Sequence, residues 1–91
     1  MKMSIFAVKD SATAAFMQPF FCVTPAQALR SFGDAVNGDR QSPIAQHPDD
    51  YDLYHLGEFD DQSGQVESLK RPRQLARGKD VKVRESSDVQ K

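Results

Sequence analysis

The sequence predicts a small α+β domain: a two-layer sandwich in which one helix covers one face of an antiparallel sheet of about four strands. Three observations support this prediction. Residues 51–59 form an aromatic and aliphatic run bounded by Pro48 and Gly64, which is typical of a strand entering a hairpin. Residues 24–36 carry a helix start signal and an apolar stripe. The predicted order is β-β-α-β-β, and the helix must bury its stripe on the sheet.

The length and composition restrict the class of protein. The chain has 91 residues, which make one domain at most, and its single cysteine, Cys22, cannot form an internal disulfide. No stretch approaches the ~20 apolar residues of a membrane span, and the N-terminal apolar run is too short for a signal peptide. We therefore expect a cytosolic protein with no membrane partner.

Three further segments are strand candidates. Residues 3–8 are a continuous apolar run, which is long enough for a buried strand and too short for a helix. Residues 16–23 form a second candidate, in which Pro19 lacks a donor and so belongs at a sheet edge or a bulge. Residues 65–69 form a weaker strand, joined to the aromatic run by an acidic loop in which we expect Gly64 to adopt a positive φ.

The helix has the sharpest local signal in the chain. Thr24 can cap it through its hydroxyl group, and Gln27, three residues later, completes a capping box. Leu29, Phe32 and Val36 recur at helical spacing. We expect this stripe to face the sheet and the helix to end near Val36.

Charge divides the chain near residue 69. Residues 1–69 carry four basic and ten acidic side chains, whereas residues 70–91 carry eight basic and three acidic ones. The second segment has few aliphatic residues and no periodicity, so it cannot offset its own ordering entropy. We expect a folded domain over 1–69 and a flexible basic tail over 70–91, which either binds a partner or is simply solvated.

No pattern predicts a catalytic, metal or cofactor site. The carboxylates around residues 60–64 lack the ligand spacing of a calcium loop and fit turn chemistry instead. His47 and His55 lack the close ligand pairs that zinc sites use, and nothing supports Cys22 as a nucleophile. We expect a protein that is not an enzyme, and we expect His55 to hydrogen-bond a backbone carbonyl.

The aromatic residues fill either a core alone or a core and a binding face. Six Phe and two Tyr are more than one small face can hide, so some should be exposed. Phe20 and Phe21 are adjacent, so on a regular strand one of them points away from the helix. Such side chains can stack on unpaired bases. The acidic body opposes phosphate unless the tail or a local basic patch takes part.

Three stretches resemble one viral family. HPDDYDLYHLGEFDDQSG at 47–64, QPFF at 18–21 and AQALRSFGD at 26–34 resemble, in order and spacing, the small nonstructural protein of the gokushoviruses, the microviruses related to the Chlamydia phages. The likeness covers residues 3–66. It implies a role in bacteriophage DNA replication, or in the switch to single-strand synthesis, in the cytoplasm of the infected bacterium. It supplies no catalytic residues.

We therefore expect a viral nonstructural protein that binds single-stranded DNA and forms a homodimer. The alternative is an interaction module that engages a host or viral replication protein without touching DNA. Two aromatic residues of the body and seven basic residues of the tail are the side chains expected at the DNA: Phe21, Tyr54, Lys70, Arg71, Arg73, Arg77, Lys79, Lys82 and Arg84.

Overall fold

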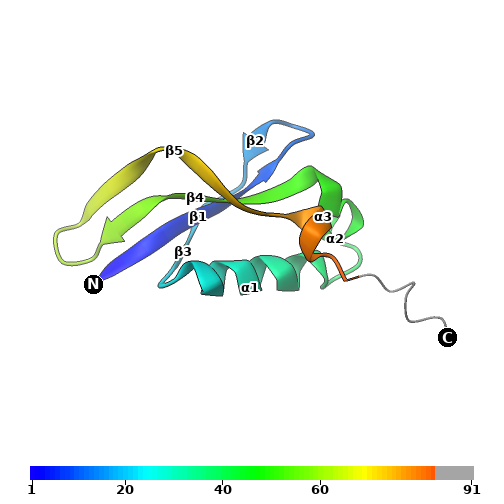
Figure 1. The fold of residues 1–91 in the computed structure, drawn as a ribbon, viewed down its shortest axis with the longest axis horizontal. Helices are drawn as coiled ribbons and strands as arrows, with labels where there is room; N and C mark the ends of the chain where they lie inside the picture. The colour runs from blue at the N-terminus through cyan, green and yellow to red at the C-terminus, as the bar shows by residue number, and fades with distance from the viewer. Residues whose placement is uncertain (84–91) are drawn as a thin grey trace.

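The computed structural model describes residues 1–83, in which one antiparallel sheet lies across one main helix (Figure 1). In chain order the elements are β1 (Lys2–Asp10), β2 (Ala15–Phe16), β3 (Phe20–Cys22), α1 (Pro25–Val36), α2 (Pro43–Gln46), the 3₁₀ turn η1 (Pro48–Asp50), β4 (Tyr51–Asp60), β5 (Gln65–Arg77) and α3 (Gly78–Val81). The predicted α+β class, with one main helix on one face of an antiparallel sheet, is confirmed.

Strand β1 is the centre of the sheet. It pairs with β4 along its whole length on one side and with β2 and β3 on the other, and β5 pairs with β4 at the far edge. Residues 4–8 of β1 are all buried. The unbroken apolar run in the sequence therefore marks a strand that is covered on both faces.

The second predicted strand is two short ones. β2 and β3 are separated by residues 17–19. Directly after β2, Met17 still donates its N–H to the Val8 carbonyl of β1 (2.7 Å). Pro19 has no N–H to continue the pairing, which confirms its expected place at an irregular edge.

Helix α1 begins where the sequence predicts. The Thr24 hydroxyl oxygen accepts the N–H of Gln27 (3.3 Å). The Gln27 side-chain oxygen accepts the N–H of Val23 (3.0 Å), one residue before the expected partner. The first bond satisfies a backbone donor that a helix start leaves without a partner inside the helix, and the second satisfies the Val23 N–H just before the cap.

The core lies between α1 and the sheet. Ala28, Phe32 and Val36 are the buried residues of α1, and they join Phe6 and Leu53, among others, in one cluster. The expected place of Leu29 in this stripe is wrong, because that side chain is 37 % exposed. Ala28, which is fully buried, takes the position against the core cluster instead.

The structure differs most from the sequence-based prediction at residue 70. The chain does not become a flexible tail there; β5 continues to Arg77, and α3 follows it to Val81. Leu75, Ala76 and Val81 pack against the core cluster. The predicted boundary after Leu69 is therefore wrong for residues 70–81, whose ordering is supported by pairing with β4. The rest of the predicted tail, residues 84–91, lies outside the described residues.

Asn37, at the end of α1, holds residues 81–83 in place through hydrogen bonds. Its side-chain N–H groups donate to the carbonyls of Gly33 (2.9 Å) and Val81 (3.0 Å), and its side-chain oxygen accepts the N–H of Val83 (2.8 Å). One amide thus satisfies backbone groups of two elements that are far apart in the sequence.

Within residues 1–83, no helix is long and apolar enough to cross a membrane.

Two glycines mark places where backbones cross closely. A Cβ atom at Gly57 would overlap the Glu67 carbonyl oxygen, and one at Gly78 would overlap the Pro48 carbonyl oxygen. Gly33, inside α1, has no atom within 4 Å of such a Cβ. The glycines therefore differ in what a side chain would do to the fold.

We predict that Gly57→Ala lowers the free energy of unfolding by about 1–3 kcal/mol, because β5 must move away from β4. Gly33→Ala is the matched control, and it should raise stability by about 0.5–1 kcal/mol, since alanine favours a helix interior. Urea unfolding followed by circular dichroism measures both. Equal stability of the Gly57→Ala variant and the wild type would contradict the close approach.

We also predict that truncation after Leu69 lowers the thermal midpoint by more than about 10 °C, since each kcal/mol lost shifts the midpoint of a domain this size by about 4–8 °C. Lys70→Gln combined with Arg71→Gln keeps the segment but removes charge, and it should change the midpoint by no more than about 4 °C. If the truncated chain melts as the full chain does, residues 70–83 contribute nothing to the fold.

Candidate nucleic-acid interface

The side of the sheet opposite α1 carries most of the exposed rings. Phe6 and Val8 of β1 belong to the core under α1, so the residues that alternate with them face the other way. The strand register extends this side across the sheet: Lys9 pairs with Phe16, Ala7 with Tyr54 and Ile5 with Phe21. We call this surface the aromatic face, and it comprises Met3, Ile5, Ala7, Lys9, Phe16, Phe21, Asp52, Tyr54, Phe59, Val66, Gln74 and Arg77.

Four aromatic rings form two pairs on the aromatic face. Phe16 meets Tyr54 edge to face, with ring centroids 5.4 Å apart, and Phe21 meets Phe59 in the same way at 5.8 Å. Phe16 and Phe21 are 41 % and 49 % exposed. The Lys9 ammonium lies 5.5 Å from the Phe16 ring centre. The surface therefore offers aromatic rings next to a cation.

The structure brings the two predicted aromatic site residues together. Phe20 packs against the core and its neighbour Phe21 points away from α1, as strand alternation predicts. Tyr54 lies on the same side as Phe21. Sequence reasoning missed Phe16 and Phe59 as members of this surface. Tyr54 and Phe59 are five residues apart and share a side only because the pairing of β1 with β4 shifts register between them.

Arg77 is the one predicted cation that the register places on the aromatic face. It pairs with Asp52, and its Nε lies 3.7 Å from the Asp52 carboxylate oxygen Oδ1. That oxygen is buried and accepts no hydrogen bond from the described residues. Lys9 is the cross-strand neighbour of Asp52 on its other side. This row of the sheet therefore contains two positively charged side chains and one carboxylate.

Arg73 lies on the other side of the sheet and is tied to the core. Its guanidinium Nη2 donates to His55 Nδ1 (3.2 Å), while His55 Nε2 donates to the Gly57 carbonyl (3.1 Å). A neutral imidazole with its proton on Nε2 makes both bonds. The ring is buried and stacks on Phe6 with centroids 5.0 Å apart. The expected bond from His55 to a backbone carbonyl is confirmed.

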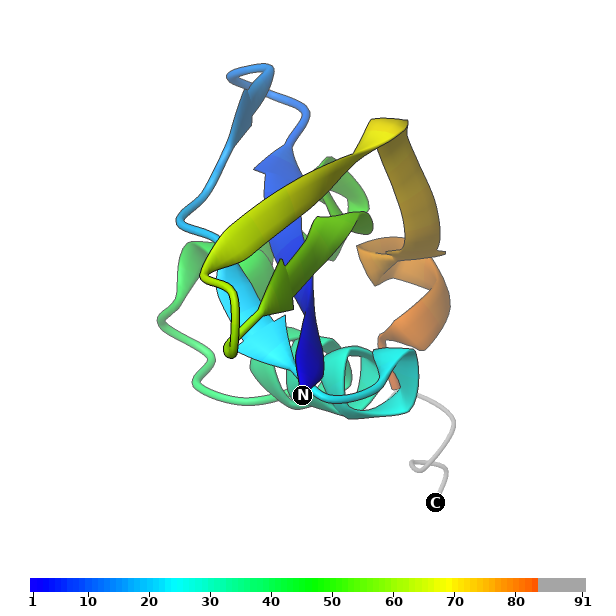
Figure 2. The same ribbon diagram turned by 90° about the vertical axis from the view of Figure 1, so that its left-hand side faces the viewer.

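The other predicted cations do not gather at one place. Lys82 donates to the Val36 carbonyl at the end of α1 (3.4 Å), and Lys79 is exposed on α3. Lys70 and Arg71 are exposed where the pairing of β5 with β4 is irregular, at the bend visible in Figure 2. Arg84 lies outside the described residues. The predicted basic set is therefore dispersed over the fold, and the part of it nearest the aromatic face is Arg77 with the bend of β5.

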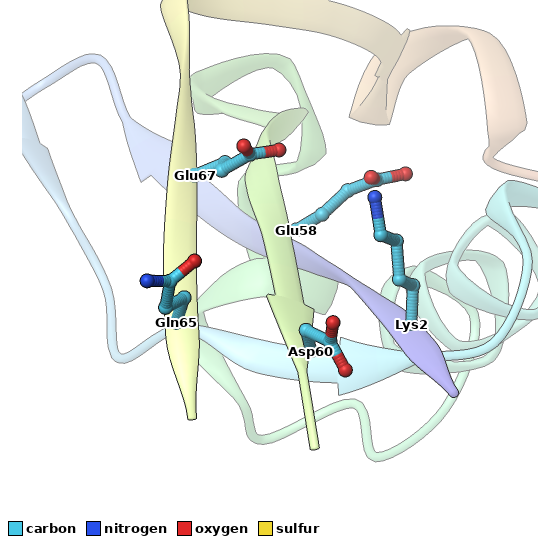
Figure 3. A pocket seen from close by; sticks show the side chains of 5 residues that line it. All are labelled: Lys2, Glu58, Asp60, Gln65 and Glu67. Carbon is cyan, nitrogen blue, oxygen red and sulfur yellow. The ribbon is translucent and has the colours of Figure 1, made fainter. Parts of the chain in front are cut away.

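Carboxylates gather on the side of the sheet that carries α1, at the end with the β4–β5 turn (Figure 3). Glu58, Asp60 and Glu67 line a shallow pocket there with Lys2 and Gln65. Glu58 pairs with Ser4, which alternates in phase with Phe6, so these acidic side chains lie opposite the aromatic face. These three carboxylates are thus directed away from the rings, whereas Asp52 lies on the aromatic face.

Asp60 is held in its charged form. The backbone N–H of Gln62 donates to its carboxylate (3.0 Å) and lowers the pKa of that carboxyl below its ordinary value. Gly64 closes the same turn with φ 75°, as predicted.

In the part of the chain that the structure describes, no group of three His, Cys, Asp or Glu residues is placed to hold a metal ion.

Comparison with known proteins gives one match. The model of the Phage ORF5 protein family matches residues 3–81. A search of curated proteins and a search of solved structures each found no match. The matched segment includes all the described strands and helices apart from Lys2 of β1, and so it includes the part of β5 that sequence reasoning assigned to a tail. The chain therefore belongs to the Phage ORF5 protein family, a family of bacteriophage proteins.

Proposed function

We propose that this phage protein is a nonstructural, non-enzymatic protein of the gokushovirus type that binds single-stranded DNA through its aromatic face. It acts in genome replication, or in the switch to single-strand synthesis, in the cytoplasm of the infected bacterium. One observation carries the proposal: the two exposed ring pairs share a surface with Lys9 and Arg77, and the clustered carboxylates lie on the opposite side.

Stacking and charge act together on such a surface. An aromatic ring that stacks on an unpaired base contributes about 1–3 kcal/mol and accepts any base, because every base has a π-face. Cations near the rings neutralise phosphates and release counterions. Lys70 and Arg71 lie in the bend of β5, between Val66 and Gln74 of the aromatic face, and we propose that they extend its cationic border. Lys79 of α3 and Lys82, which follows α3, are not needed for this binding.

The alternative function is a module that binds a replication protein and does not touch DNA. The observation that favours it is the exposed apolar area itself, since Phe21 and Val66 are 49 % and 60 % exposed. Exposed apolar patches on soluble proteins mark interaction sites. Only the first function predicts a complex with single-stranded DNA that weakens as the salt concentration rises.

We predict a salt-sensitive complex with labelled single-stranded DNA. If Lys9, Lys70, Arg71 and Arg77 each meet one phosphate, the slope of log K against log salt should be about −2.8, from about −0.7 per phosphate. Lys70→Gln with Arg71→Gln should flatten that slope by about 1.4. Fluorescence anisotropy at several salt concentrations measures it. Arg30→Gln is the matched control, because Arg30 is exposed on α1, and it should leave the slope unchanged.

Phe21→Ala should lower the affinity about 5- to 150-fold at every salt concentration without changing the slope, because stacking releases no counterions. Leu29→Ala removes a partly exposed side chain from α1 instead and should bind as the wild type does. A wild-type protein that shows no binding at low salt would support the replication-protein alternative.

We further propose a homodimer that forms through the aromatic face. The outer edge of β5 carries Lys70, Arg71 and Pro72, and the opposite edge is broken between β2 and β3. Charge, proline and short strands all discourage pairing at sheet edges. The aromatic face is therefore the better surface for a second copy.

Because the dimer and the DNA would use one surface, we predict that short single-stranded DNA converts the dimer into a one-to-one complex. Analytical ultracentrifugation with and without the oligonucleotide measures this change. A dimer that persists at saturating DNA would show two separate surfaces, and a monomer at tens of micromolar without DNA would show that the face does not self-associate.

A further inference from the structure

The hairpin arm formed by residues 11–19 is weakly attached to the rest of the fold. All of its residues are exposed. At the base of the arm, the Ser11 N–H and hydroxyl both donate to the Asp50 carbonyl (2.8 and 3.0 Å). Beyond that base, β2 pairs with β1 only at Ala15 and Phe16, and Met17 adds one bond to the Val8 carbonyl. Elements with few buried contacts open at low free energy compared with global unfolding.

The turn of the arm also contains backbone strain. Ala14 has φ 60°, in the left-handed region that disfavours a Cβ atom. The β4–β5 turn uses Gly64 for the same conformation, with φ 75°. Both turns begin with an aspartate, Asp10 or Asp60, whose carboxylate accepts the N–H two residues later at 3.0 Å. The two turns are thus alike, and the arm has the less favourable residue.

The arm carries one half of an aromatic pair, and the fixed part of the sheet carries the other. Phe16 belongs to β2, whereas Tyr54 belongs to β4, which is paired on both of its sides. The second pair differs in this respect. Phe21 lies in β3, whose neighbours Phe20 and Cys22 pack against the core cluster.

We propose that the arm is a lid over a site for one unpaired nucleobase of single-stranded DNA. β2 detaches from β1, Phe16 moves off Tyr54, and the base enters between the two rings and stacks on both. Lys9, which lies beside Phe16, then meets a phosphate next to that base. The inference rests on the proposed function and adds the site and its opening step.

A disulfide across the arm tests the lid. Asp10 and Ala15 are direct cross-strand partners, and opposed residues of an antiparallel pair lie at the Cα separation a disulfide needs. Asp10→Cys with Ala15→Cys, in a Cys22→Ser background, locks β2 onto β1 when oxidised. We expect the oxidised protein to bind single-stranded DNA about 5- to 150-fold more weakly than the same protein reduced, which is the loss of one stacked base.

The chain supplies a matched control. Ser4 and the native Cys22 are cross-strand partners of β1 and β3, so Ser4→Cys alone allows a disulfide on the strand that the lid does not need to move. Oxidation of this variant should leave the affinity unchanged. Phe16→Ala added to the locked background should make the oxidised and reduced proteins bind equally weakly. Circular dichroism verifies that each form is folded.

The outcomes separate the lid from the proposed function. If the locked protein binds equally well oxidised and reduced, the base does not enter beneath the arm and the lid is wrong, while DNA binding stands. If neither the reduced protein nor the wild type binds DNA, the proposed function is wrong and the lid with it. If oxidation of the Ser4→Cys control weakens binding as much, the effect does not belong to the arm.

Discussion

The rest of the structure depends on the pairing of β1 with β4. These two strands are bonded from Lys2 and Asp60 at one end to Asp10 and Tyr51 at the other, and each also pairs with a further strand. The ladder positions the core under α1 and the rings on the other side at once. Because its paired residues are 41 (Asp10 and Tyr51) to 58 (Lys2 and Asp60) positions apart in the sequence, neither side of the sheet is complete until the chain has closed this long-range contact.

The structural features that were predicted correctly from the sequence are those that depend on local chemistry. The cap at Thr24, the irregular edge at Pro19 and the positive φ at Gly64 each follow from the physical properties of one or two residues, and the structure has all three. The extent of β5 could not be predicted in this way. Its second half is ordered by pairing with β4 and by the packing of Leu75 and Ala76 against the core, and the Asn37 side chain holds Val81 and Val83 beyond it. Composition does not report such contacts.

The candidate site was predicted in part for the same reason. Alternation along one strand placed Phe21 on the exposed side, but the contributions of Phe16 and Phe59 depend on register between strands. The basic residues were grouped by their proximity in sequence, and the fold separates them: Arg73 binds His55 and Lys82 binds the end of α1. Charge that appears as one block in the sequence therefore has several structural uses.

The register shift of β4 has a consequence for how insertions and deletions would act on this family. Ile5 and Phe6 are consecutive in β1, yet their partners Gly57 and His55 leave Leu56 as an extra residue. Deletion of Leu56 would leave the two sides unchanged, but side chains alternate with a period of two, so a regular ladder that included Leu56 would exchange the two sides beyond it. Phe59 would then lie on the side of α1 and Glu58 on the side of Phe21. The separation of rings from carboxylates thus depends on the parity of a single strand.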